Sequence, residues 1–396
     1  MEGDGVGTPL SQRLPGEHYR TVQDAVRDRL AGAGLDALCT DDPSDVAYLT
    51  GFFHHPGERP VTVLLDAERT VLVLPELERE HAQAQHAAGD LVAYPEYPGL
   101  RPPLSYLPGT GRRDRIGVPG SMTLARRDAL RAALPAATLS VTPVVEAMRQ
   151  VKYPAEIALH AEAARITDRM LAAGRELIEQ AVAAGADLPS EAELAAHVGG
   201  VGTGIMYAEH TDVVVVGMLA GGLVYAGARS AHPHALPSEY RLRDGDTFML
   251  SLGCAVGGRY VEGERTFVLG EPTADQRRYH DAVREAQQVG ADAIRAGAVC
   301  SEVNRRCLQV IVDAGLGEYL RHRQGHGIGL GMHEPPWLAD GDDTVLAANM
   351  IVSNEPGLYV PGHAGYRISD SMLVTETGAR RLTSYPRQLD DLVICP

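Results

Sequence analysis

The segment "RQGHGIGLGMHEPP", residues 323–336, is the most specific pattern in the chain. It places His326, His333 and Glu334 among closely spaced glycines, and glycine turns at strand ends are where a β-scaffold exposes catalytic side chains. The segment is not a phosphate-binding loop, because no Lys-Ser/Thr pair follows it and no strand-loop-helix context surrounds it. A single histidine in a loop is more often a surface residue than a catalyst, so the interpretation depends on the neighbouring clusters.

Three other clusters of histidine and glutamate lie in the same half of the chain. "SAHPHALP" holds His232 and His234, "GERTF" holds Glu264 two residues after Glu262, and "NEPGLY" holds Glu355 shortly before "GYRISD". Residues two apart in a predicted strand face the same side of a sheet, so Glu262 and Glu264 lie side by side. Two buried like charges repel unless a cation balances them or one of them takes up a proton.

Composition excludes several classes of function. The chain has 396 residues, 44% of them hydrophobic and 22% charged, with a formal net charge of −16. This balance predicts a globular protein that binds a small molecule, and neither nucleic acid nor a membrane. No apolar run is long enough to span a bilayer. The five scattered cysteines have no metal-type spacing and favour reduced thiols, which indicates a cytoplasmic protein.

The order of predicted elements indicates two domains behind a loose tail at 1–16. Strands that alternate with helices predict a small α/β domain over 17–148. Two pairs of helices among antiparallel strands predict an α+β domain over 149–396. Within it, "TDVVVVG" at 211–217 and "GLVYAG" at 222–227 are predicted to pair as strands.

The motifs "PHALP", "GDTFMLSLG", "ERTF", "GHGIGLGMHEPP", "NEPGLYV" and "GYRISDSMLVTETG" resemble, in order and spacing, those of the pita-bread fold. Xaa-Pro aminopeptidases, prolidases, methionine aminopeptidases and creatinase share that fold. The resemblance extends over roughly residues 20–390 and implies an α+β pita-bread catalytic domain after a smaller α/β creatinase-type domain. It also implies a hydrolase of carbon–nitrogen bonds, similar to aminopeptidase P, that works as a homodimer.

The chain departs from this resemblance at the metal ligands. The family's peptidases hold two metal ions with two aspartates, one histidine and two glutamates. The matching positions here are Ser251, Glu262, His326, Glu355 and Ser369. Because a serine hydroxyl is a weak ligand for a divalent cation, a two-metal site is not expected, and we expect no metal cofactor. The alternative is a single divalent metal on Glu262, His326 and Glu355.

Creatinase is a metal-free precedent within the family, and it has "ERT" where the peptidases have "TRT". The resemblance puts Glu264 and Glu355 in its guanidinium-binding positions and His234 in the position of its catalytic histidine. We therefore expect a metal-independent hydrolase that cleaves a C–N bond in a small guanidino, amidino or amino substrate. His234 would act as general base and then acid, together with the catalytic residues His326, Glu355 and Glu264.

Six further residues are expected to bind the substrate: Glu262, His333, Ser251, Ser369, Arg59 and Arg367. Arg59 lies in "FFHHPGERP", which matches the creatinase loop that reaches a neighbouring subunit's site. The alternative interpretation is that Glu264 pairs with Arg265 or Arg367 and has only a structural role.

Two other functions remain open on the sequence. One is a metal-dependent Xaa-Pro-type aminopeptidase or dipeptidase with a reduced ligand set. The other is a catalytically inactive homologue that binds peptides. Metal content and the effect of a chelator on activity separate the metal-free enzyme from the metal-dependent one, and the retained histidines weigh against an inactive homologue.

Overall fold

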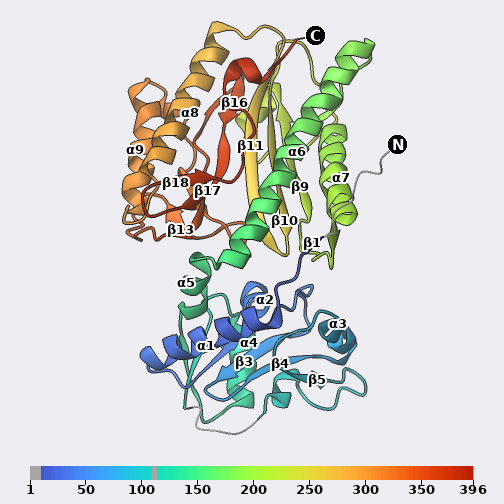
Figure 1. Cartoon of the computed structure of the whole chain (residues 1–396), viewed down its shortest axis with the longest axis vertical. Helices are drawn as coiled ribbons and strands as arrows, with labels where there is room; N and C mark the ends of the chain where they lie inside the picture. The colour runs from blue at the N-terminus through green and yellow to red at the C-terminus, as the bar shows by residue number, and fades with distance from the viewer. Residues whose placement is uncertain (1–9, 109–113, 396) are drawn as a thin grey trace, which may run out of the picture. The chain divides into compact units, whose positions relative to one another are not determined.

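The computed structural model describes residues 10–108 and 114–395 (Figure 1). The chain divides into two compact units. Arg13–Arg149 and Val214–Gly217 form the N-terminal unit, and the remaining described residues form the C-terminal unit. Of the predicted tail at 1–16, residues 1–9 lie outside the described part, and the limits 17–148 and 149–396 remain proposals. No helix among the described residues is long and apolar enough to cross a membrane.

The N-terminal unit is built on a six-stranded sheet with the strand order β5-β4-β3-β2-β6-β7. Its strands are β2 (Ala37–Thr40), β3 (Thr62–Asp66), β4 (Thr70–Pro75), β5 (Asp90–Tyr94), β6 (Arg115–Val118) and β7 (Thr138–Val141). Its helices are α1 (Gly16–Gly32), α2 (Pro43–Thr50), α3 (Arg79–Ala84), α4 (Leu124–Ala133) and α5 (Val144–Gln150). The pairs β2–β3 and β3–β4 are antiparallel and the other three are parallel, as expected of a mixed α/β domain.

The C-terminal unit is built on a nine-stranded sheet with the order β13-β12-β14-β17-β11-β10-β9, to which β18 and β19 add beside β17 and β11. These strands are β9 (Ala220–Ala226), β10 (Thr247–Val256), β11 (Arg259–Leu269), β12 (Gly325–Gly327), β13 (Glu334–Leu338), β14 (Ile351–Asn354), β17 (Ser369–Val374), β18 (Ala379–Arg381) and β19 (Val393–Ile394). Two small sheets pair β1 (Leu10–Ser11) with β8 (His210–Thr211) and β15 (Gly357–Val360) with β16 (Ala364–Arg367).

Four helices cover the two halves of this sheet (Figure 1). They are α6 (Pro154–Ala184), α7 (Glu191–Glu209), α8 (Ala274–Ala293) and α9 (Cys300–Asp313). The apolar faces of α6 and α7 pack on β9, β10 and β11, whereas those of α8 and α9 pack toward β13, β14 and β17. Burial of these faces is the main stabilising contribution to the unit.

Local sequence signals explain where α6 and α7 begin and end. Pro154 occupies the first turn of α6, and Gly185 ends that helix in the left-handed region at φ 60°. Ser190 caps α7 by accepting a hydrogen bond from the Glu193 amide, and the Glu193 side chain accepts one from the Ser190 amide in return.

The hairpin β10–β11 brings the predicted site positions together. Gly257 and Gly258 both have positive φ, at 57° and 75°, as a two-residue hairpin turn of type I′ requires. The resulting register pairs Ser251 with Glu264, and β17 in turn places Ser369 beside Glu264. Directly opposed residues on neighbouring strands point to the same face, so these three side chains share one side of the sheet.

The predicted pairing of 211–217 with 222–227 is wrong. Only His210–Thr211 is a strand there, and Asp212 ends it with a left-handed φ of 53°. The partner of β9 is instead β10. A run of valines predicts a strand by propensity, but tertiary context decides whether it pairs.

Candidate active site

A pocket of about 850 Å³ opens in the C-terminal unit. Its wall includes seven of the side chains expected to act in the site: His234, Ser251, Glu262, Glu264, His333, Glu355 and Arg367. Strand β11 and the loop that follows β14 supply its carboxylates, and β10 supplies Ser251. His333 comes from the glycine-rich segment before β13. The volume suits a small ligand that is mostly enclosed.

His326 is 1% exposed and contacts three residues of the pocket wall, Glu262, Glu355 and His333. Its Nδ1 lies 3.0 Å from the carbonyl oxygen of Gly327, which fixes the proton on that nitrogen and turns Nε2 toward the carboxylates. Nε2 lies 3.1 Å from Glu355 Oε1 and 3.6 Å from Glu262 Oε2. Within the described part of the chain, Nε2 has no aligned hydrogen-bond partner although it is buried. A buried nitrogen between two carboxylates is a favourable place for a cation.

Neighbouring side chains hold the two carboxylates in place. Ser369 Oγ donates to Glu262 Oε1 at 2.8 Å, and Ser353 Oγ lies 3.4 Å from Glu355 Oε1. The ring of His333 lies 3.9 Å from that of His326, centroid to centroid. Ligand atoms of Glu262, His326 and His333 all lie within 4.8 Å of one another, a spacing that suits one metal ion. Carboxylate oxygens and imidazole nitrogens are common ligands of divalent ions.

Burial and mutual charge shift the protonation of these groups in opposite directions. Burial raises the pKa of Glu262, and the nearby charge of Glu355 raises it further. Burial alone would raise the pKa of Glu355, but the close contact and charge of His326 outweigh it and lower that pKa. Burial alone would lower the pKa of His326, but the two carboxylates outweigh it and raise that pKa. The three side chains therefore behave as one coupled acid–base unit.

The carboxylate of Glu264 is balanced by Arg367. Nε of Arg367 donates to Oε2 of Glu264, and Nη2 lies 2.9 Å from Oε1. The guanidinium also donates to the hydroxyls of Tyr359 at 2.8 Å and Tyr225 at 2.6 Å. Ser251 donates its hydroxyl proton to Glu264 and lies 3.1 Å from Nη2 of Arg367. Because both members of the pair are about 95% buried, the chain itself supplies the cation that Glu264 needs.

Besides His333, two predicted site residues are exposed. His234 lies at the edge of the pocket, on the segment that follows β9. Arg59 lies in the N-terminal unit, where it forms ion pairs with Glu58 at 2.7 Å and Glu96 at 2.6 Å. The roles expected of both remain predictions.

Sequence reasoning missed two buried tyrosines that contact Arg367 behind the pocket wall. Tyr359 follows Glu355 on the next strand, and its hydroxyl joins Arg367 to His322 Nε2, 2.8 Å away. Tyr225 lies on β9 and meets the same guanidinium. No local pattern in the sequence signals these contacts, because they join residues of β9, β15 and β16.

Comparison with known proteins identifies the family. A model described as Metallopeptidase family M24 matches residues 158–376, and one described as Creatinase/Prolidase N-terminal domain matches residues 23–151. The chain belongs to metallopeptidase family M24, the family of the pita-bread Xaa-Pro peptidases. The predicted fold, a creatinase-type domain followed by a pita-bread domain, is thereby confirmed. The expected enzyme class, a hydrolase of carbon–nitrogen bonds, is confirmed as well.

Three similar proteins have names that describe their activity. The probable dipeptidase PepE of Mycobacterium tuberculosis is 32% identical over 391 residues, which cover 96% of this chain and 98% of that protein. The Xaa-Pro dipeptidase of Lactobacillus delbrueckii subsp. lactis is 31% identical over 378 residues, covering 94% and 99%. The crystal structure of the prolidase from Pyrococcus horikoshii OT3 matches with a TM-score of 0.80 at 26% identity, covering 93% and 99%.

These findings correct two expectations. The expected metal-independent, creatinase-like activity is wrong, because the chain belongs to a metallopeptidase family and its relatives are named as dipeptidases. The expectation that the protein needs no metal is wrong for the same reason. The geometry supplies a physical cause: a cationic substrate was invoked to balance Glu264, and Arg367 already balances it. What remains near Glu262 and His326 is a set of side chains that suits a metal ion.

Proposed function

We propose that this protein is a metal-dependent dipeptidase of the Xaa-Pro type that works with a reduced ligand set. It binds one divalent ion on Glu262, His326 and Glu355, with His333 beside them. The observation that carries the proposal is the buried His326 Nε2, which faces both carboxylates while Nδ1 is committed to a backbone carbonyl. The names of the relatives and the family support the choice of substrate class.

The residues present fit one ion and disfavour a second. Two carboxylates and an imidazole offer oxygen and nitrogen donors around one point. The next carboxylate, Glu264, is paired with Arg367. The hydroxyls of Ser251 and Ser369 already donate hydrogen bonds, to Glu264 and Glu262 respectively. A second ion would have to displace a buried guanidinium, and it would find only neutral ligands there.

A divalent ion bound here supplies a Lewis acid that polarises the scissile carbonyl and lowers the pKa of a water molecule. The protein's own side chains bind the peptide and move protons. Burial, followed by the charge of His326, lowers the pKa of His333 to about 4, so its ring is neutral near pH 7. A neutral imidazole can donate one N–H to the oxyanion that forms at the carbonyl. We assign to His234, which lines the pocket, the return of a proton to the leaving nitrogen of proline.

Hydrolysis of Xaa-Pro dipeptides by protein loaded with manganese, cobalt or zinc tests the proposal. We expect turnover that a chelator abolishes and that added metal restores. His326→Ala should lose both the bound ion and turnover, whereas His234→Ala should keep the ion and lose turnover. Full activity in protein stripped of metal would contradict the proposal. The expected homodimer remains a prediction, tested by the mass of the protein in solution.

A further inference from the structure

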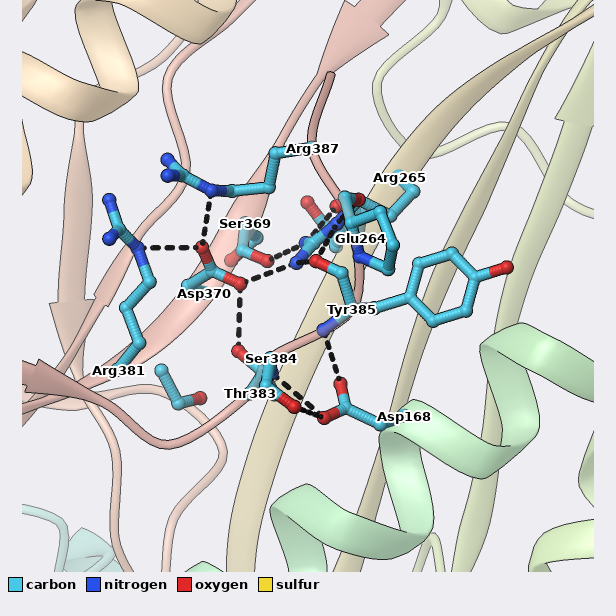
Figure 2. Close-up of polar contacts among 12 residues, drawn as sticks. Asp168, Glu264, Arg265, Ser369, Asp370, Arg381, Thr383, Ser384, Tyr385 and Arg387 are labelled. Carbon is cyan, nitrogen blue, oxygen red and sulfur yellow. Dashed lines mark hydrogen bonds and ion pairs between the residues drawn. The ribbon is translucent and has the colours of Figure 1, made fainter. Parts of the chain in front are cut away.

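A second charged cluster lies on the face of the sheet opposite the pocket. Arg265 and Asp370 follow Glu264 and Ser369 in sequence, so their side chains point to the other side of β11 and β17. Both are fully buried, and Arg265 Nη2 lies 2.7 Å from Asp370 Oδ1. Figure 2 shows the Asp370 carboxylate with Arg265 on one side and with two further arginines, Arg381 and Arg387, on the other. We call Arg265, Arg284, Arg381 and Arg387 the arginine cluster.

The cluster holds more positive charge than its carboxylate can balance. Three side chains donate hydrogen bonds to Asp370: Arg265, Gln287 and Thr383. Nε of Arg381 then lies 3.3 Å from Oδ2, and Nε of Arg387 lies 4.0 Å away. One carboxylate therefore faces three guanidiniums, and arginine does not release its proton at ordinary pH. This local excess stands out in a chain whose net charge is −16.

The outer ends of two guanidiniums converge on one neutral atom. Nη2 of Arg381 lies 3.1 Å from Gln288 Oε1, and Nη2 of Arg387 lies 3.3 Å from the same oxygen. The side chains of both arginines are between one fifth and one third exposed, so a solute can reach them. Hydrogen bonds from a guanidinium to an anionic oxygen are roughly twice as strong as those to a neutral one. An anion would therefore bind these donors better than the amide does.

The same face of α8 adds unsatisfied groups. Arg284 lies one helical turn before Gln288, and its buried Nε has no hydrogen bond among the described residues, although long ion pairs join its guanidinium to Asp281 at 4.0 Å and Glu285 at 3.9 Å. His280, one turn earlier, is 1% exposed, and neither of its ring nitrogens has a hydrogen-bond partner in the described structure. Burial, followed by the charges of Arg284 and Arg265, lowers the pKa of His280 to about 4. The histidine is therefore neutral and adds no further positive charge.

We propose that Arg284, Arg381 and Arg387 bind a tetrahedral oxyanion: inorganic phosphate or the phosphate group of a small metabolite. Planar guanidiniums donate paired N–H groups that match the oxygens of phosphate, and a doubly charged anion offsets the excess charge that Asp370 leaves. The site is separate from the metal ligands and does not depend on the proposed peptidase activity. Arg265, beside the site, donates from Nη1 to the carbonyls of Glu264 and Ser369 at 2.7 Å.

Thermal unfolding of the full chain tests this site. The midpoint is measured against inorganic phosphate, and separately against adenosine monophosphate, at constant ionic strength. Concentrations stay below about 10 mM, where the general effect of phosphate on protein stability is small. We expect the midpoint to rise and follow a saturation curve for one site. Isothermal titration of the wild-type chain with phosphate should give one site per chain.

Two variants and a matched control make the test specific. Arg387→Gln and Arg381→Gln each remove one of the repelling cations, so without phosphate they should unfold close to the wild-type midpoint or above it. In both, the phosphate-dependent rise should be lost. Arg380→Gln changes an exposed neighbour outside the cluster and should keep the wild-type rise.

The response to the two ligands shows which phosphate compound binds. A rise with phosphate alone assigns the free ion, and a rise with both ligands assigns a phosphate group on a metabolite. No saturable response in the wild type, by unfolding or by titration, would overturn the proposal. So would a rise that Arg381→Gln and Arg387→Gln both retain. If one of the variants fails to fold, the other and the wild-type titration still decide.

Discussion

The guanidinium of Arg367 lies against the carboxylate of Glu264 in the wall of the pocket, with Nη2 2.9 Å from Oε1 and Nε donating to Oε2. The two residues are 103 positions apart in sequence and belong to strands of different sheets, β16 and β11. Their pairing fills, with a fixed positive charge, the space beside the cluster of Glu262, His326 and Glu355. It leaves the other carboxylates available for a single metal ion.

Removing the guanidinium should destabilise the fold. Arg367→Gln leaves the buried carboxylate of Glu264 without its cation, and breaking one side of a buried pair costs about 3–5 kcal/mol. We expect the free energy of unfolding, measured in urea, to fall by that amount. The double variant Glu264→Gln with Arg367→Gln removes both charges and should regain part of the loss. Equal destabilisation in the single and double variants would show that the charge on Glu264 is not the cause.

A second buried pair should control the loop that carries His333. Lys152 Nζ lies 3.0 Å from Glu334 Oε1, and Glu334 Oε2 accepts the amide of Gly331 at 3.1 Å. Lys152→Met leaves a buried carboxylate without its cation and should lower the free energy of unfolding by about 3 kcal/mol. Because the loop also loses a fixed contact, the variant's kcat on a dipeptide should fall. The surface variant Arg380→Gln is the control and should keep the wild-type kcat. An unchanged kcat in Lys152→Met would show that the pair of Lys152 and Glu334 does not control the loop that carries His333.

The N-terminal unit should become less stable as the pH rises from 4 to 6. Burial, with the charge of Asp42, raises the pKa of Asp45 to about 6 despite the ion pair with Arg149 at 3.0 Å. The folded state therefore holds the Asp45 proton more tightly than the unfolded state does. This contribution is complete below about pH 4 and is lost as the pH rises through 6, by about 3 kcal/mol in all.

The variant Asp45→Asn cannot titrate at this position, so its stability is the reference. The difference between wild type and Asp45→Asn, from urea midpoints at pH 4 and pH 7, should change in favour of the variant as the pH rises. A difference that stays constant over this range would refute the raised pKa of Asp45.

Much of the fold follows from local signals that act over a few residues. Pro154, Gly185 and Ser190 limit two helices through backbone chemistry that does not depend on tertiary contacts. The hairpin of β10 and β11 follows from its turn glycines and its β-branched residues. The valine run at 211–217 led to a wrong prediction of strand pairing, because pairing depends on partners that are distant in sequence.

The charge balance of the site was only partly accessible from sequence. Alternation along β11 could have excluded Arg265 as the partner of Glu264, since adjacent residues face opposite sides, and that leaves Arg367. The expectation of a cationic substrate rested on counting carboxylates without their partners. The contacts of Arg367 with Tyr225 and Tyr359 join three strands, and no local pattern encodes them.

The metal content of the purified chain tests the central claim most directly. Protein saturated with manganese or zinc and then dialysed should hold one ion per chain by elemental analysis, and His326→Ala should hold none. The control variant Ser251→Ala should still hold one, because Ser251 bonds to Glu264 rather than to the proposed ligands. A wild-type chain that retains two ions, or one that retains none, would contradict a single-metal site on Glu262, His326 and Glu355.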